Sequence, residues 1–209
     1  SKIIPKIMSD AFSLAMKPRR GPVCLNLPRN ILAASNSYNI NTKKPSFENE
    51  SKQKGNKENI KKAAKLIGSS KCSVIIVGAG IKYNSKYKEV IKLAELCNIP
   101  IVTAAGHGDA IPFGHKLNAG QMGPRGNPVA SRLVKNADVI LAIGTRLGFN
   151  STFYSYENIN KEAKIIQIEL EKTMLGKYFP VKVKIHADAA TATKQLYEEI
   201  KKEKIKLNV

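Results

Sequence analysis

The chain has 209 residues, which is enough for one full domain with a tail or for two small domains. Its 35 Lys and Arg residues outnumber its 16 Asp and Glu residues and give a net charge of +19 at pH 7. Because the lysines are spread along the whole chain without an Arg-rich block, this charge indicates a solvated surface, and we expect no nucleic-acid partner. No apolar run could cross a bilayer and the N-terminal residues lack the apolar region of a signal peptide, so we expect no membrane partner and a cytoplasmic protein.

The first 56 residues contain a helix-like pattern, then a strand-like run, then a polar stretch. Apolar residues recur at helical spacing over residues 1–17, and the apolar run at 22–28 is typical of a short buried strand. One helix and one strand cannot form a core, so we interpret residues 1–34 as the C-terminal tail of a preceding domain. Residues 35–56 are rich in Asn, Ser, Lys and Pro, which predicts a linker.

A central domain is expected at residues 57–209, where apolar strands alternate with polar loops and amphipathic helices. Residues 73–77 (Ser-Val-Ile-Ile-Val) form a β-branched run that suits a strand buried on both faces. The sequence predicts helices at 57–68, 85–97, 127–136 and 188–203, and five strands at 73–77, 99–104, 139–144, 164–169 and 181–185. This order predicts an α/β fold, a Rossmann-like three-layer sandwich with a mainly parallel sheet.

The first strand of this domain ends at Gly78-Ala-Gly80, which could allow a backbone to approach a phosphate. A dinucleotide-binding fingerprint would need a third glycine, where this chain has Tyr83. It would also need an acid after the second strand, where the chain reads Thr-Ala-Ala-Gly106. NAD binding is therefore not expected, and two alternatives stay open: a nucleotide bound in another pose, or a plain tight turn.

The long loop at 105–126 is rich in glycine and holds His107, Asp109 and His115. Loops of this length in compact domains are usually functional. No further cluster of metal ligands accompanies the two histidines, and no partner for a general base can be placed, so we expect neither a metal site nor a catalytic site here. The three cysteines show no C-x-x-C spacing and indicate no zinc site or disulfide framework.

Six motifs occur in an order and spacing that resemble the thiamine-diphosphate-dependent acetolactate synthase family. They lie at 21–28 (Gly-Pro-Val-x-Leu-x-Leu-Pro), 77–80 (Val-Gly-Ala-Gly), 112–123 (Pro-Phe-Gly-His-x-Leu-x-Ala-Gly-x-Met-Gly), 137–147 (Ala-Asp-Val-Ile-Leu-Ala-Ile-Gly-Thr-Arg-Leu), 164–169 (Lys-Ile-Ile-Gln-Ile-Glu) and 186–189 (His-Ala-Asp-Ala). The resemblance covers the end of the pyrimidine-binding domain and the whole central domain. Within the family, residues 115–120 and 164–167 are most similar to sulfoacetaldehyde acetyltransferase.

The resemblance implies a transferase or lyase whose chemistry belongs to the domains that flank this one. In the family, a glutamate of the first domain activates the thiamine ring, and a Gly-Asp-Gly…Asn motif of the last domain holds magnesium and the diphosphate. No Gly-Asp-Gly occurs in this chain, so no catalytic residue is expected in it, and thiamine diphosphate and Mg would bind outside it. The implied partners are the flanking thiamine-binding domains, in a homodimer or homotetramer of the parent enzyme.

Some family members bind FAD or ADP in the central domain, and the resemblance places such a site on nine residues. They are Gly78, Gly80, Met122, Gly123, Gly144, Thr145, Arg146, Glu169 and Asp188. Acetolactate synthases carry Phe-Asp-Asp-Arg where this chain has Leu147-Gly-Phe-Asn150, and their usual aspartate is Glu169 here. A vestigial pocket is the alternative, and Arg146 could meet a diphosphate or pair with a neighbouring carboxylate.

Two hypotheses for the whole chain follow. The first is a non-catalytic central-domain fragment of an acyl-transferring or aldehyde-transferring enzyme of the sulfoacetaldehyde acetyltransferase or acetolactate synthase type. The second is a stand-alone nucleotide-binding or regulatory α/β module.

Overall fold

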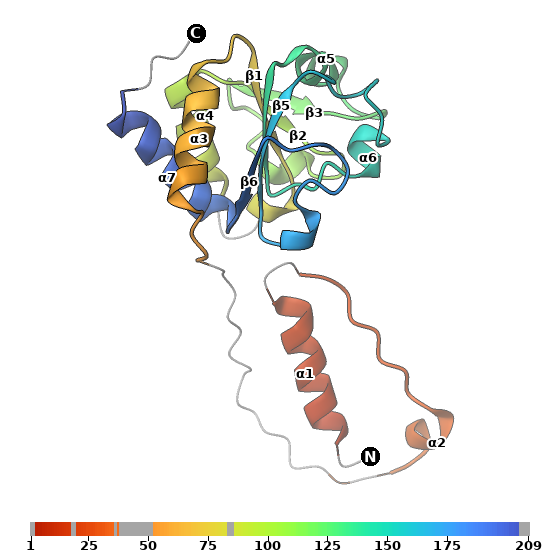
Figure 1. The fold of residues 1–209 in the computed structure, drawn as a ribbon. Helices are drawn as coiled ribbons and strands as arrows, with labels where there is room; N and C mark the ends of the chain where they lie inside the picture. The colour runs from red at the N-terminus through yellow and green to blue at the C-terminus, as the bar shows by residue number, and fades with distance from the viewer. Residues whose placement is uncertain (1–2, 18–19, 36, 38–51, 83–85, 205–209) are drawn as a thin grey trace. The chain divides into compact units, whose positions relative to one another are not determined.

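The computed structural model describes residues 3–17, 20–35, 37, 52–82 and 86–204 (Figure 1). The chain divides into two compact units, Ser1–Ser51 and Lys52–Val209. The predicted linker at 35–56 falls largely outside the described residues. None of the helices in the described ranges is both long and apolar enough to span a bilayer.

In its described residues, the first unit contains two helices, α1 (Ile4–Met16) and α2 (Arg29–Leu32). The predicted helix at 1–17 is confirmed by α1, which begins with Pro5 in its first turn, where proline is tolerated. The predicted strand at 22–28 is wrong, because these residues are assigned to no strand. A strand needs a neighbour for its backbone hydrogen bonds, and the described residues of this unit supply none.

The second unit is built on one sheet of six parallel strands in the order β3-β2-β1-β4-β5-β6. The strands are β1 (Ser73–Val77), β2 (Ile101–Thr103), β3 (Asn118–Gln121), β4 (Val139–Ile143), β5 (Lys164–Glu169) and β6 (Val183–His186). The Rossmann-like α/β fold is thus confirmed, and the sheet is parallel throughout. Strand β3 was not predicted, because its Asn-Ala-Gly-Gln sequence has no β-branched or aromatic residue.

Helices cover both faces of the sheet. They are α3 (Lys57–Gly68), α4 (Tyr87–Cys97), α5 (Pro128–Asn136), α6 (Phe149–Thr152) and α7 (Ala189–Lys202), with short 3-10 turns η1 (Ala79–Ile81), η2 (Gly108–Ala110) and η3 (Lys172–Met174). Buried residues of α3, α4 and α7 belong to the core cluster on one face, and those of α5 belong to the cluster on the other. The helix starts follow local chemistry, since Asn56, Asn127 and Asp188 cap α3, α5 and α7.

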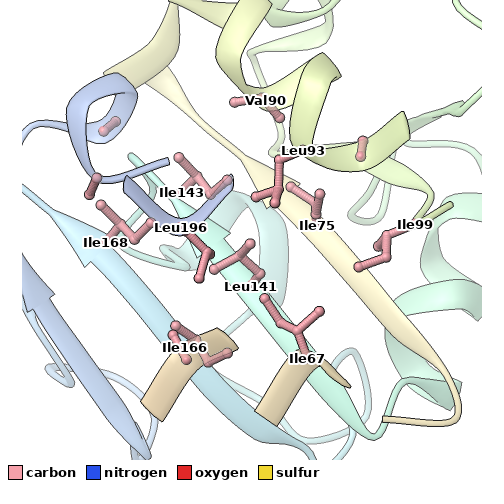
Figure 2. Close-up of a cluster of buried hydrophobic side chains, with 14 of the residues drawn as sticks. Ile67, Ile75, Val90, Leu93, Ile99, Leu141, Ile143, Ile166, Ile168 and Leu196 are labelled. Carbon is pink, nitrogen blue, oxygen red and sulfur yellow. The ribbon is translucent and has the colours of Figure 1, made fainter. Parts of the chain in front are cut away.

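Strand residues alternate between the two cores, which explains why β4 is apolar at every position and β1 at every position after Ser73. Ile75, Leu141 and Ile166 face the larger cluster, together with Leu93 of α4 and Leu196 of α7 (Figure 2). Their neighbours Val74, Ile140 and Ile165 face the smaller cluster. A strand buried on both faces has no polar side to show to water.

Residues 52–55 pack on the second unit rather than behaving as part of a linker. The backbone N–H of Asp188 donates to the carbonyl of Gln53 (3.0 Å), and the Gln53 amide donates to the carbonyl of His186 (3.0 Å). The N–H of Gly55 donates to the side chain of Gln195 (2.8 Å). The second compact unit begins at Lys52, and residues 52–55, which were expected in the linker, are bonded to the end of β6 and to α7.

Candidate functional site

The strand order reverses between β1 and β4, and the loops at the carboxyl ends of these strands form the place where open α/β sheets bind ligands. The two loops touch through their backbones. The N–H of Gly78 donates to the carbonyl of Ile143 (3.1 Å), and the N–H of Gly80 donates to the carbonyl of Gly144 (3.0 Å). Three of the nine predicted residues therefore meet at one point of the sheet edge.

The glycines at this point are required by contact between the loops. A Cβ atom on Gly80 would lie 2.6 Å from the Cα of Gly144, and one on Gly78 would lie 2.7 Å from the carbonyl oxygen of Gly144. Gly144 also has a φ of +58°, which favours glycine. Protein backbone thus occupies the space that a side chain would fill, which supports the tight-turn interpretation of Gly78-Ala-Gly80.

Asp188 is buried and already has partners. Its carboxylate accepts from Lys86 Nζ at 2.6 Å and, as the cap of α7, from the Thr191 N–H at 3.0 Å and the Thr191 hydroxyl at 2.9 Å. The Lys86 and Asp188 side chains are only 15% and 5% exposed. The Asp188 carboxylate is therefore already paired with Lys86 and Thr191 inside the protein.

Glu169 and Thr145 also make hydrogen bonds within the protein. The Glu169 carboxylate accepts from the backbone N–H groups of Leu170 (2.9 Å) and Glu171 (3.3 Å). The Thr145 hydroxyl accepts from the Leu147 N–H (3.2 Å), while its carbonyl accepts from the Gln167 amide (3.1 Å). Both residues therefore shape the loops after their strands.

Met122 and Gly123 follow β3. Met122 is buried in the smaller core cluster, and its N–H donates to the carbonyl of Thr103 (2.9 Å). Gly123 has a φ of +101°, and a Cβ atom there would lie 2.8 Å from the carbonyl oxygen of Asn150. This pair joins the long loop to the segment that follows β4.

Among the predicted residues that carry a side chain, Arg146 is the one that is exposed. The ion pairs formed between residues of the described ranges do not include Arg146. The alternative that it pairs with a neighbouring carboxylate is therefore not supported within those ranges. Its guanidinium lies at the carboxyl edge of the sheet, where an anionic ligand could reach it.

The long loop brings Lys82 to Asp109 at 3.0 Å and leaves His107 partly buried beside them. Burial and the charge of Lys82 lower the pKa of His107, and Asp109 opposes them. The buried Nδ1 of His107 and Oγ1 of Thr103 have no hydrogen-bond partner among the residues described. His115 lies apart from this group and contacts Glu95 at 3.3 Å.

No group of three or more His, Cys, Asp or Glu residues in the described ranges is arranged to hold a metal ion. Lys86 is the important residue that the sequence analysis missed. Nothing in the sequence distinguishes it from the other basic residues, because its role depends on a contact with Asp188, which is distant along the chain.

The nine predicted residues differ in whether they are available to contact a nucleotide. Arg146 offers an exposed cation that could contact a diphosphate. Asp188 does not fit a ribose while Lys86 is bound to it. Binding of FAD or ADP by these residues stays a prediction.

Residues 60–196 match the family model described as thiamine pyrophosphate enzyme, central domain. A probable acetolactate synthase large subunit of Methanococcus aeolicus is 31% identical over 94% of this chain and 33% of its own length. A sulfoacetaldehyde acetyltransferase of Roseovarius nubinhibens is 32% identical over 90% of this chain and 31% of its own length. The chain thus spans about a third of the length of these relatives.

Among solved structures, the chain is similar to the benzoylformate decarboxylase of Polynucleobacter necessarius. The TM-score is 0.67 at 18% sequence identity, over 94% of this chain and 36% of that one. At this identity the likeness concerns the fold alone.

Proposed function

Because the chain belongs to the thiamine pyrophosphate enzymes, whose central domain it contains, we propose that it is the structural central part of an acyl-transferring or aldehyde-transferring enzyme. The observation that carries the proposal is the central-domain match over residues 60–196, on a sheet whose carboxyl edge is largely occupied by its own loops. Its relatives named acetolactate synthase and sulfoacetaldehyde acetyltransferase support this enzyme type.

Thiamine diphosphate, when bound, supplies a ring that stabilises a carbanion next to a carbonyl. In the proposed function this chain contributes none of the groups that hold that cofactor or its magnesium ion. Its own contribution is a rigid sheet with apolar cores on both faces, which fixes the spacing of the flanking domains.

Residues 3–35 fit this proposal as part of a neighbouring domain. Helix α1 buries none of its residues, and Ile3, Phe12 and Leu14 are all more than half exposed. An apolar helix face of this kind requires a partner surface. We propose that a pyrimidine-binding domain supplies it in an oligomeric parent enzyme.

The proposal can be tested by calorimetric titration of the 209-residue protein with thiamine diphosphate and Mg²⁺. We expect no heat of binding, because the diphosphate-binding motif does not occur in the chain. A full-length acetolactate synthase in the same buffer is the positive control. Saturable, magnesium-dependent binding by the 209-residue protein would overturn the proposal.

Nucleotide binding, alone or within the larger enzyme, is a second candidate, favoured by the exposed guanidinium of Arg146. If FAD or ADP binds, Arg146→Ala should weaken it by about 1–3 kcal/mol, the size of a charge-assisted hydrogen bond. Lys92→Ala, on the exposed side of α4, is the matched control and should leave affinity unchanged. Equal affinities of the wild type and Arg146→Ala would assign Arg146 another role, and absence of binding would remove this candidate.

A further inference from the structure

The segment after β4 carries connected, exposed aromatic side chains that the proposed function does not use. Phe149, Phe153 and Tyr154 are 53%, 45% and 46% exposed. The ring centroid of Phe149 lies 4.9 Å from that of Phe153 and 5.6 Å from that of Tyr154, and Tyr154 stacks on Tyr178 at 4.3 Å. We call these four residues the aromatic surface. Exposed apolar patches of connected side chains mark interaction sites more often than single exposed residues do.

The backbone holds two of these rings outward at an energetic cost. Phe153 and Tyr154 have φ values of +49° and +54°, in the left-handed region that large side chains rarely adopt. The conformation is maintained because the N–H of Phe153 donates to the Phe149 carbonyl (2.7 Å) and that of Tyr154 donates to the Thr152 hydroxyl (3.1 Å).

Positive charge borders the aromatic surface. Arg146, whose side chain is exposed, belongs to the same segment after β4 as Phe149, Phe153 and Tyr154. Lys177 Nζ lies 5.6 Å from the centroid of the Tyr178 ring. Glu157 is the single acid of the described segment 146–157. An apolar centre with a cationic rim is complementary to an acidic partner.

Charge and ring geometry narrow the choice of partner. A second copy of a chain with a net charge of +19 would bring like charges together at this surface. Rings that pack against one another, at 53° between Phe149 and Phe153 and 23° between Tyr154 and Tyr178, use faces that stacked bases would need. We propose that the aromatic surface is the docking site for an acidic protein segment that carries aromatic or aliphatic anchors. This goes beyond the proposed function and does not depend on it.

The test measures binding of a fluorescein-labelled random glutamate–tyrosine copolymer to the 209-residue protein by fluorescence anisotropy at low salt. The wild type should bind it more tightly than poly-glutamate of the same length. Phe153→Asn should weaken binding about tenfold, as truncation of a buried anchor does. Asparagine tolerates positive φ, so this variant keeps the backbone conformation. Tyr154→Asn should act in the same direction.

Phe113→Ser is the matched control, because Phe113 is 96% exposed in the long loop and makes no ring contact among the residues described. It should bind like the wild type, and thermal unfolding of each variant verifies that it is folded. The proposal is overturned if Phe153→Asn binds like the wild type, if poly-glutamate binds as tightly as the copolymer, or if neither binds. The proposal is also overturned if labelled oligo(dT) or phosphatidylserine vesicles bind the wild type more tightly than the copolymer does and no longer bind the Phe153→Asn variant. Self-association that Phe153→Asn abolishes would instead identify a second copy as the occupant.

Discussion

At the scale of single residues, the ion pair of Lys86 and Asp188 has the largest consequences. Both side chains are largely removed from water, so each charge depends on the other. Asp188 also caps α7 through Thr191, which joins the start of that helix to the residue that precedes α4. The same carboxylate that was predicted to contact a cofactor thus already takes part in a buried ion pair and a helix cap.

Lys86→Met should destabilise the protein by about 3–5 kcal/mol, because it leaves a buried carboxylate without its cation. The double variant Lys86→Met/Asp188→Asn should recover part of this loss, since asparagine still caps α7 but carries no charge. Urea unfolding followed by circular dichroism measures all four proteins of the cycle. A Lys86→Met variant as stable as the wild type would show that the pair contributes nothing.

His107 should titrate below its usual range, first because it is partly buried and second because Lys82 is close. A histidine with a lowered pKa in the folded state binds fewer protons than in the unfolded state. Its contribution to stability is therefore complete above about pH 6.5 and is lost as the pH falls through the folded pKa. His107→Gln should flatten the dependence of unfolding free energy on pH in that window.

The neighbours of His107 provide opposite controls in an NMR titration of its ring protons. Lys82→Met removes a cation and should raise the pKa of His107, whereas Asp109→Asn removes an anion and should lower it further. Shifts of the same sign in both variants, or a wild-type pKa at or above about 6.5, would contradict this account.

At the scale of elements, the contact between the loops after β1 and β4 fixes the sheet edge. Gly80→Ala should destabilise the protein by about 1–3 kcal/mol, since the new methyl group overlaps backbone that cannot rotate away. Gly114→Ala is the matched control, because a Cβ atom there would have no neighbour within 4 Å. Thermal unfolding compares the two, and equal midpoints would contradict the contact.

The sequence predicted the elements that rely on their own residues and missed those that rely on neighbours. Strands β1 and β4 are largely apolar runs that suit a sheet covered on both faces, and these two strands and β5 were placed correctly. Strand β3 pairs with β2 although its side chains favour no strand, and the run at 22–28 has strand-like residues but no described partner.

In the candidate site, too, features set by local sequence were predicted and features set by distant contacts were not. Sequence spacing brought Gly78, Gly80 and Gly144 to one sheet edge, because strand ends in a parallel sheet are adjacent. It could not reveal that Lys86 holds Asp188, because no local pattern encodes a contact over this distance along the chain. The left-handed backbone of Phe153 and Tyr154 is likewise visible only in the structure.

At the scale of the whole molecule, the chain divides before Lys52. Limited proteolysis with trypsin should cut first after Lys43, in the predicted linker outside the described residues. The product that begins at Lys44 should stay folded, because Gln53 and Gly55 are bonded to the rest of the second unit. Mass spectrometry of the early fragments tests this, and initial cutting within residues 73–104 would contradict the division.

The most direct test of the central claim is a turnover assay of the purified 209-residue protein. The assay supplies thiamine diphosphate, Mg²⁺ and phosphate with sulfoacetaldehyde or pyruvate, and a full-length sulfoacetaldehyde acetyltransferase and a full-length acetolactate synthase serve as the active controls. A central domain that positions its neighbours but holds neither the activating glutamate nor the diphosphate motif should give the rate of the buffer alone. Thiamine-dependent turnover that rises in proportion to the concentration of this protein would contradict the account.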